Sequence, residues 1–422
     1  NETIYVDDMQ ITVSNPGATI KLPQSDTTAP DAPTLAGPSV TNSTTPTLTG
    51  TAEAGSTVNL SEGGTALGQA TADGSDGSFS ITVSTLAEGS HDIVAKATDA
   101  AGNEGAASTA VTVVVDATAP AAPTLAGPSL TNSTTPALTG TAEAGSTVKL
   151  YEGDTALGQV TADGSNGSFS ITTSTLAEGS HDIVAKATDA AGSEGAASTT
   201  VSVVVDATAP AAPTLAGPNL TNSPTPALTG TAEAGSTVKV YEGSIELGQV
   251  TADGSDGSFS ITTSTLAEGS HDIVAKATDA AGNEGAASTA VTVVVDTTAP
   301  AAPTLTGPSL TNSTTPTLTG TAEAGSIVKL TQGNTALGQA TADTSDGSYT
   351  ITVSTLTEGS HDITVTATDA ANNVSGPSAA HTVVVDTTAP GVPTVTVTSP
   401  TTDTTPDFNG TAEVGSAVTI LV

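Results

Sequence analysis

The stretch VVVDATAPAAP at residues 113–123 decides how this chain is organised. A run of valines ends on Asp116, and a proline-rich Asp-x-Thr-Ala-Pro-x-x-Pro element follows. The same element starts at Asp26, Asp206, Asp296 and Asp386, so it returns every 90 residues. A fixed period of this kind identifies repeated structural units. We therefore divide the chain into residues 1–26, repeat 1 (27–116), repeat 2 (117–206), repeat 3 (207–296), repeat 4 (297–386) and the start of a truncated repeat 5 (387–422).

The charge balance restricts the partners of the chain. There are 43 acidic residues against 7 lysines and arginines, which gives a formal net charge of −36. This argues against binding to nucleic acid or to anionic membrane surfaces, because both need clustered Lys or Arg. No apolar stretch approaches the roughly 20 residues of a membrane helix, so direct membrane insertion is not expected. Cysteine is absent, which leaves no disulfides and no thiolate metal site. The composition favours cations as partners.

The residue pattern inside one repeat predicts short half-buried strands. Phe79, Ile81 and Val83 alternate with Ser80, Thr82 and Ser84, and such a period of two is typical of strands with one buried face. Clusters of Gly, Pro, Asn, Asp and Ser separate the strands, as in turns. The predicted strands of repeat 1 are 32–37, 46–53, 57–62, 66–72, 78–84, 91–98 and 108–115. Seven such strands predict an all-β fold of tandem immunoglobulin-like β-sandwiches, arranged as an elongated rod.

Several motifs carry a family resemblance. GTAEAGS (50–56), TDAAGN (98–103) and the Asp-x-Thr-Ala-Pro-x-x-Pro element resemble the bacterial Ig-like repeats of giant RTX-type and biofilm-associated surface adhesins, which are type I-secreted. The resemblance covers residues 26–422. It implies extender domains at the bacterial cell surface, stiffened by calcium near the domain junctions. Residues 1–26 differ: Met9, Ile11 and Val13 alternate, which predicts the closing strand of an upstream β-domain followed by a linker.

Strand direction predicts where the acidic residues gather. In seven strands that alternate in direction, the turns at 51–56, 72–78 and 98–105 share the end at which the linker arrives. Carboxylates crowded at one end repel one another, and a hard divalent cation relieves this repulsion. Calcium, with its 6–8 oxygen ligands, suits the site better than magnesium or zinc. The predicted ligands are the linker Asp, the Glu of the first turn and the Asp of the last turn in each copy: Asp26, Glu53, Asp99, Asp116, Glu143, Asp189, Asp206, Glu233, Asp279, Asp296, Glu323, Asp369, Asp386 and Glu413.

Simpler interpretations stand beside the calcium hypothesis. Asp99 could merely form an Asx-turn, and Glu53 could be a solvated charge at a strand end. His91 shares the inward face of Ile93, so a histidine at the edge of the core is favoured over a catalytic one, and no enzyme activity is expected. The predicted function is a monomeric, calcium-stiffened extender that projects a distal binding domain for adhesion or biofilm formation. The alternatives are repeats that themselves bind a glycan or host protein, or a spacer in a secreted polysaccharide-degrading enzyme.

Overall fold

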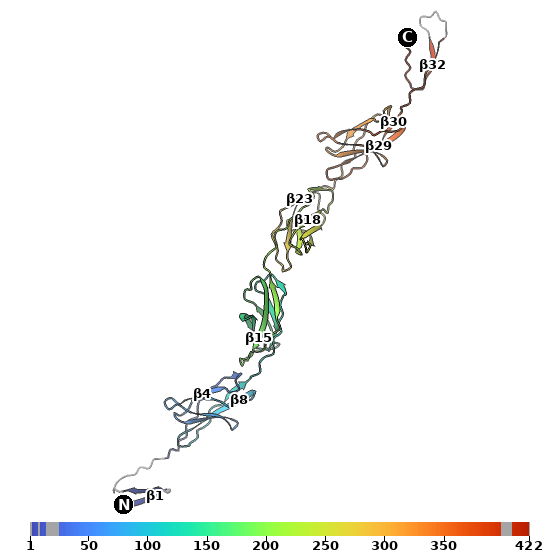
Figure 1. Cartoon of the computed structure of the whole chain (residues 1–422). Coiled ribbons are helices and arrows are strands. Elements are labelled where there is room, and N and C mark those ends of the chain that lie inside the picture. Colours follow the sequence, from blue (N-terminus) through green and yellow to red (C-terminus); the bar gives the residue numbers. More distant parts are fainter. Residues whose placement is uncertain (1, 7–8, 14–24, 398–406, 422) are drawn as a thin grey trace. The chain divides into compact units, whose positions relative to one another are not determined.

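The computed structural model describes residues 2–6, 9–13, 25–397 and 407–421. Its regular elements are all strands, β1 to β32 (Figure 1). Within the described residues, no helix is long and apolar enough to cross a bilayer. The chain divides into two compact units, Asn1–Ala207 and Thr208–Val422. The first contains repeats 1 and 2, and the second contains repeats 3 and 4.

Each repeat contains the same seven strands. Repeat 1 has β3 (Val40–Thr41), β4 (Thr47–Thr51), β5 (Thr57–Glu62), β6 (Thr65–Thr71), β7 (Ser78–Thr82), β8 (Gly89–Thr98) and β9 (Val111–Val115). Repeat 2 has β10 (Leu130–Thr131), β11 (Ala137–Thr141), β12 (Thr147–Glu152), β13 (Thr155–Thr161), β14 (Ser168–Thr172), β15 (Gly179–Thr188) and β16 (Val201–Val205). Repeat 3 has β17 (Leu220–Thr221), β18 (Ala227–Thr231), β19 (Thr237–Glu242), β20 (Ile245–Thr251), β21 (Ser258–Thr262), β22 (Gly269–Thr278) and β23 (Val291–Val295). Repeat 4 has β24 (Leu310–Thr311), β25 (Thr317–Thr321), β26 (Ile327–Gln332), β27 (Thr335–Thr341), β28 (Ser348–Thr352), β29 (Gly359–Thr368) and β30 (His381–Val385).

The strands of repeat 1 form two sheets. One has five strands in the order β3-β9-β8-β5-β6, and the other pairs β4 with β7. All neighbouring strands are antiparallel except β3 and β9, which run parallel through Val40↔Val114 and Thr41↔Val115. The other three repeats have the same strand order. This is a sandwich of two sheets, as the sequence predicts.

The first predicted strand of each repeat differs from the expectation. Residues 32–37 do not form a continuous strand. Instead Thr34 donates its N–H to the Thr51 carbonyl (2.9 Å), and Ala36 forms a single bridge with Thr49. The chain then crosses to the other sheet as β3. Pro38 lies between the two pairings, and a proline has no N–H to continue a ladder.

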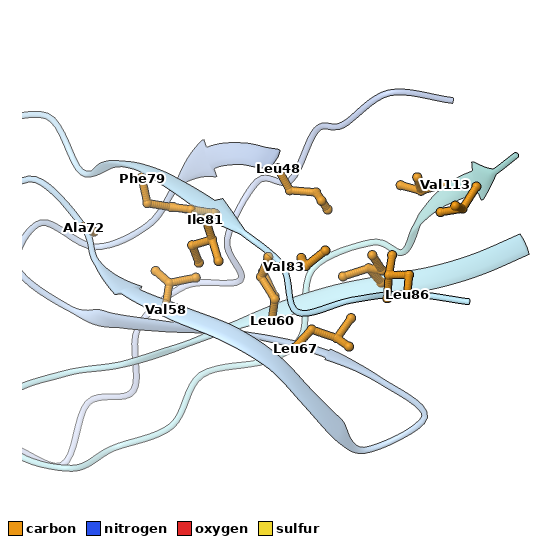
Figure 2. Close-up of a cluster of buried hydrophobic side chains, with 13 residues drawn as sticks. Leu48, Val58, Leu60, Leu67, Ala72, Phe79, Ile81, Val83, Leu86 and Val113 are labelled. Carbon is orange, nitrogen blue, oxygen red and sulfur yellow. The ribbon is translucent and has the colours of Figure 1, made fainter. Parts of the chain in front are cut away.

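The core lies between the two sheets. The side chains of Val58 and Leu60 on β5 and of Leu48 on β4 are fully buried. Figure 2 shows Ile81, which pairs with Leu48 in the two-stranded sheet, directed toward Val58 of the facing five-stranded sheet. Each of the four repeats has its own core cluster, within residues 48–115, 138–205, 228–295 and 318–385. No residue of one cluster belongs to another, so each repeat buries its own apolar side chains.

The two ends of the chain carry shorter pieces of sheet. At the N-terminus, β1 (Glu2–Val6) pairs with β2 (Met9–Val13) as an antiparallel hairpin. The predicted strand through residues 9–13 is therefore a strand, and residues 14–24 of that segment lie outside the described residues. At the C-terminus, β31 (Thr394–Val397) pairs with β32 (Phe408–Thr411). The hydroxyl contact between Thr394 and Thr411 (2.6 Å) has a counterpart between the equivalent residues of repeat 4, Thr304 and Thr321 (2.8 Å).

Candidate functional site

The predicted acidic residues of each repeat lie at the end where the linker arrives, here called its N-terminal end. In repeat 1 this end comprises residues 26–33, 52–56, 72–77 and 99–105. The antiparallel pairings bring these segments together, as the alternation of strand direction predicts. Direct contacts confirm it: the Ala52 N–H donates to the Gly77 carbonyl (2.9 Å), and the Asn103 side chain donates to the Asp26 carbonyl (3.0 Å).

The last turn of the repeat is organised by the Asp99 carboxylate. Its Oδ1 accepts the N–H groups of Ala101 (2.8 Å) and Asn103 (2.9 Å), and its Oδ2 accepts the Asn103 amide Nδ2 (2.8 Å). The Asn103 side chain, followed by the backbone donors, lowers the pKa of Asp99 below its ordinary value despite partial burial. Asp99 therefore forms the Asx-type turn that the sequence offered as the simpler interpretation. Oδ1 of Asp99 thus accepts the N–H groups of the turn, and Oδ2 accepts only the side-chain amide of Asn103.

That amide joins the turn to the linker, a contact that the charge pattern of the sequence does not predict. The Asn103 Nδ2 donates both to Asp99 Oδ2 and to the main-chain carbonyl of Asp26. In repeat 4, Asn373 Nδ2 likewise donates to Asp369 Oδ2 (2.8 Å) and to the Asp296 carbonyl (2.7 Å). The Asp26-type and Asp99-type residues are thus brought together as predicted. The contact involves the linker's carbonyl, however, and not its carboxylate.

Repeat 2 lacks this amide because Ser193 stands at the equivalent position. The Ser193 N–H still donates to Asp189 Oδ1 (2.9 Å), so the turn is kept. Asp189 Oδ2, however, is buried and has no hydrogen-bond partner. A buried carboxylate oxygen without a partner is costly.

The linker carboxylates lie apart from this contact. Each accepts a hydrogen bond from the N–H two residues later: Thr28 to Asp26 (3.0 Å), Thr118 to Asp116 (3.2 Å), Thr298 to Asp296 (3.1 Å) and Thr388 to Asp386 (3.0 Å). Asp206 also has a partner. These carboxylates hold the start of the linker in a turn.

The Glu53-type residues also lie apart from the amide contact. The Glu53 side chain is exposed beside Asp31 and Thr34, on the edge of an open depression. Its main-chain carbonyl accepts the Ser56 N–H (3.0 Å), and the carbonyls of Glu143, Glu233 and Glu323 accept equivalent bonds. Glu413 additionally accepts the Gly391 N–H (3.3 Å). These glutamates lie at the predicted end of the repeat, with their carboxylates in solvent.

The donor chemistry of the N-terminal end suits a hard cation in part. No three Asp, Glu or His side chains among the described residues are grouped closely enough to hold a metal ion. Calcium would therefore need main-chain carbonyls and water for most of its 6–8 ligands, both of which it accepts. The atoms that fit are the Asp99-type Oδ2 and the Asp26-type carbonyl, which converge on one point, and the partnerless Asp189 Oδ2. Calcium binding by the fourteen predicted residues stays a prediction.

A glutamate at the opposite end anchors the departing linker. Glu88 Oε1 accepts the Ala117 N–H (3.0 Å) and the Thr118 hydroxyl (3.2 Å). Glu358 makes the equivalent contacts to the Thr387 N–H (3.1 Å) and the Thr388 hydroxyl (3.3 Å), and it also accepts the Thr387 hydroxyl (2.6 Å). Hydrogen bonds from the Thr387 hydroxyl and then its N–H lower the pKa of Glu358. Each linker that leaves one of the four described repeats thus begins tied to that repeat.

The recurring histidine is a structural residue at the edge of the core. His181, His271 and His361 are buried. His91 contacts the Glu62 carboxylate through Nδ1 (2.9 Å) and the Ala87 carbonyl through Nε2 (2.9 Å). The contact with Glu62, then that with Ala87, raises the pKa of His91. These contacts agree with the expected position at the edge of the core.

Comparison with known families assigns the class of this all-β chain. The bacterial Ig-like domain family matches at residues 18–117, 125–207, 214–297 and 305–387. The chain belongs to this family and carries four tandem copies of its domain, which confirms the predicted family and sandwich fold. The comparison with curated proteins gave no match.

Solved structures provide further similarities. The chain is similar to a tetra-tandem repeat in the extending region of a large adhesion protein, with 24% identity, a TM-score of 0.31, and coverage of 85% of this chain and 100% of the other. It is similar to fibronectin(III)-like modules of Clostridium thermocellum CbhA, with 17% identity, a TM-score of 0.28, and coverage of 40% and 90%. It is also similar to the BSP domain of a biofilm-associated protein, with 13% identity, a TM-score of 0.19, and coverage of 89% and 100%.

Proposed function

We propose that this chain is a spacer in a bacterial cell-surface adhesin. Its repeats would stand end to end outside the cell and hold a distal binding domain away from the surface. The alternation of strand direction supports this, because the linker reaches each repeat at one end and leaves it at the other. A strand such as β8, with 10 residues, spans about 33 Å. Each repeat would therefore add at least that length to the spacer.

The observation that carries the proposal is the double attachment of the Asp296 linker. The Asp296 N–H donates to the Thr221 carbonyl of repeat 3 (2.9 Å), while its carbonyl accepts the Asn373 amide of repeat 4 (2.7 Å). Thr297, the next residue, donates its N–H to Glu268 of repeat 3 (3.0 Å). One residue of the linker is thus bonded to both repeats. Such a joint transmits orientation and force, which a spacer needs and a flexible tether lacks.

Calcium at the joints is the second part of the proposal. The supporting observations are the net charge of −36 and the convergence of the Asp99-type carboxylate with the linker carbonyl. When bound, the ion would supply the positive charge that neutralises these oxygens. The protein's own part is to position them: the Asx-type turn fixes the carboxylate, and the Glu88-type residue fixes the start of the linker. Extracellular calcium modules bind at roughly 10⁻⁴–10⁻³ M.

The experiment is thermal unfolding of the whole chain in calcium, in magnesium and in EGTA. At a free calcium concentration about 100 times the dissociation constant, binding to the folded state alone stabilises it by about 2.7 kcal/mol. For a domain of this size that corresponds to a rise in Tm of about 10–20 °C. The combined Asp99→Asn, Asp279→Asn and Asp369→Asn variant should lose most of this rise. The control is Asp92→Asn, which changes an acidic side chain on β8 that accepts the Thr112 hydroxyl. This variant should keep the rise in Tm.

The result that would contradict the calcium part is an equal Tm in calcium and EGTA. The spacer function would then still stand on the protein-only contacts at Asp296. A larger rise of Tm in magnesium than in calcium would mean that the same site binds magnesium and not calcium.

A further inference from the structure

The joints between successive repeats are built differently, although the linkers are nearly identical. Two asparagine side chains donate hydrogen bonds across the joint between repeats 3 and 4. Asn373 Nδ2 donates to the Asp296 carbonyl (2.7 Å), and Asn222 Nδ2 of repeat 3 donates to the Asn372 carbonyl of repeat 4 (3.1 Å). The first bond attaches the linker to the next repeat, and the second attaches the body of one repeat to the last turn of the next.

The joint between repeats 1 and 2 has neither bond, although both repeats are fully described. Ser193 replaces the asparagine, and its side chain makes no hydrogen bond to the Asp116 carbonyl. Asn42, equivalent to Asn222, makes no hydrogen bond to the last turn of repeat 2, and its Nδ2 is 3.8 Å from the position of a Cβ at Gly192. The Asp116 linker is therefore bonded to the repeat that it leaves and not to the one that it enters.

The absence of an asparagine amide at residue 193 also has a consequence inside repeat 2. Asp189 Oδ2 is buried without a hydrogen-bond partner, whereas the equivalent oxygens of Asp99, Asp279 and Asp369 each accept an asparagine Nδ2 at 2.8 Å. The turn itself survives through the Ser193 N–H and Asp189 Oδ1 (2.9 Å). The change from Asn to Ser thus acts on the joint while preserving the domain.

We propose that the side-chain amide at the Asn103 position positions the linker and sets the stiffness of each joint, and that the joint entering repeat 2 is the spacer's hinge. The linker there keeps its contacts to Glu88 and Thr41, so its pivot lies after Thr118. Each missing hydrogen bond corresponds to about a fivefold larger population of bent states. This inference does not depend on calcium, so its failure would leave the proposed function standing.

The test measures distance distributions between spin labels in the whole chain, in EGTA. The sequence has no cysteine, so two introduced cysteines are the only labelling sites. Ser80→Cys with Ser170→Cys spans the joint between repeats 1 and 2. Ser260→Cys with Thr350→Cys spans the joint between repeats 3 and 4. All four positions are exposed and equivalent, on β7, β14, β21 and β28.

We expect a broader distribution across the first joint than across the second. Ser193→Asn should narrow the first, because three sister repeats already accommodate asparagine there, and the matched control Ser193→Ala should leave it broad. Asn373→Ser should broaden the second. Equal widths in the unsubstituted chain, or no narrowing in Ser193→Asn with circular dichroism unchanged, would overturn the proposal.

Discussion

Gly140→Ala should destabilise repeat 2 more than any other single-methyl change in its sheets. An added Cβ would lie 2.0 Å from the Thr124 carbonyl oxygen and 2.7 Å from Cζ of Phe169. The first of these neighbours is backbone and cannot rotate away. The segment that follows the linker would have to move off β11.

The magnitude follows from what this movement breaks. Overpacking of a core typically costs about 1–3 kcal/mol, and the rigid neighbour places this case near the upper value. The displaced segment also risks the bonds from the Thr124 N–H to the Thr141 carbonyl (2.9 Å) and from the Ala126 N–H to the Thr139 carbonyl (2.8 Å), each worth about 1 kcal/mol. We expect a total of about 3–5 kcal/mol, which is a large part of the stability of a small domain.

Force spectroscopy of the whole chain is the assay, because each repeat has its own core and should give its own unfolding event. The Gly140→Ala chain should show three events at the original force and one at a lower force. Gly164→Ala is the matched control in the same repeat: no atom lies within 4 Å of its added Cβ, and its φ is ordinary. The reasoning is refuted if Gly140→Ala leaves all four events unchanged, or if Gly164→Ala weakens repeat 2 as much.

Three further predictions concern individual contacts within the repeats and their linkers. The pKa of His91 is raised in the folded state, so its protonated form stabilises the fold fully below about pH 6.5, and this contribution is lost as the pH rises through the raised pKa. Glu62→Gln should therefore reduce the fall in Tm between pH 6 and pH 8. An unchanged fall in Tm would exclude the His91–Glu62 pair as its source. Asp99→Ala removes the acceptor of the Ala101 and Asn103 amides, so hydrogen exchange at 99–105 should accelerate while β8 stays protected; unchanged exchange would mean that the turn does not need the carboxylate. Glu268→Gln weakens the acceptor of the Thr297 N–H and hydroxyl, so exchange of that amide should accelerate, whereas equal rates would show that the linker is held by other contacts.

The fold was largely predictable because its signal is local. Alternation in 57–62, 78–84 and 91–98 corresponds closely to β5, β7 and β8, since a strand with one buried face leaves a period-two pattern. The predicted strand at 32–37 was wrong in form. In the structure this segment pairs only at Thr34 and Ala36, passes Pro38 and then forms the two-residue parallel strand β3. Pairings this short leave no period-two pattern in the sequence, because they are determined by the path of the chain between the two sheets.

The location of the candidate site was predictable from the sequence, but the atoms that meet there were less predictable. Strand direction correctly placed Asp26 and Asp99 at the same end of the repeat. Which oxygen of Asp26 takes part depends on the backbone path of the linker, which residue types do not reveal. The role of Asn103 was missed because an amide carries no charge. Comparing the copies could have indicated it, since serine replaces this asparagine at residue 193 alone.

Small-angle X-ray scattering of the whole chain in millimolar calcium, and then in EGTA, tests the central claim most directly. A calcium-stiffened spacer predicts a long, well-defined maximum dimension in calcium and a broader, shorter distribution in EGTA, with magnesium unable to replace calcium. Superimposable profiles in the two solutions would contradict calcium stiffening. A compact particle in both solutions would contradict the spacer itself.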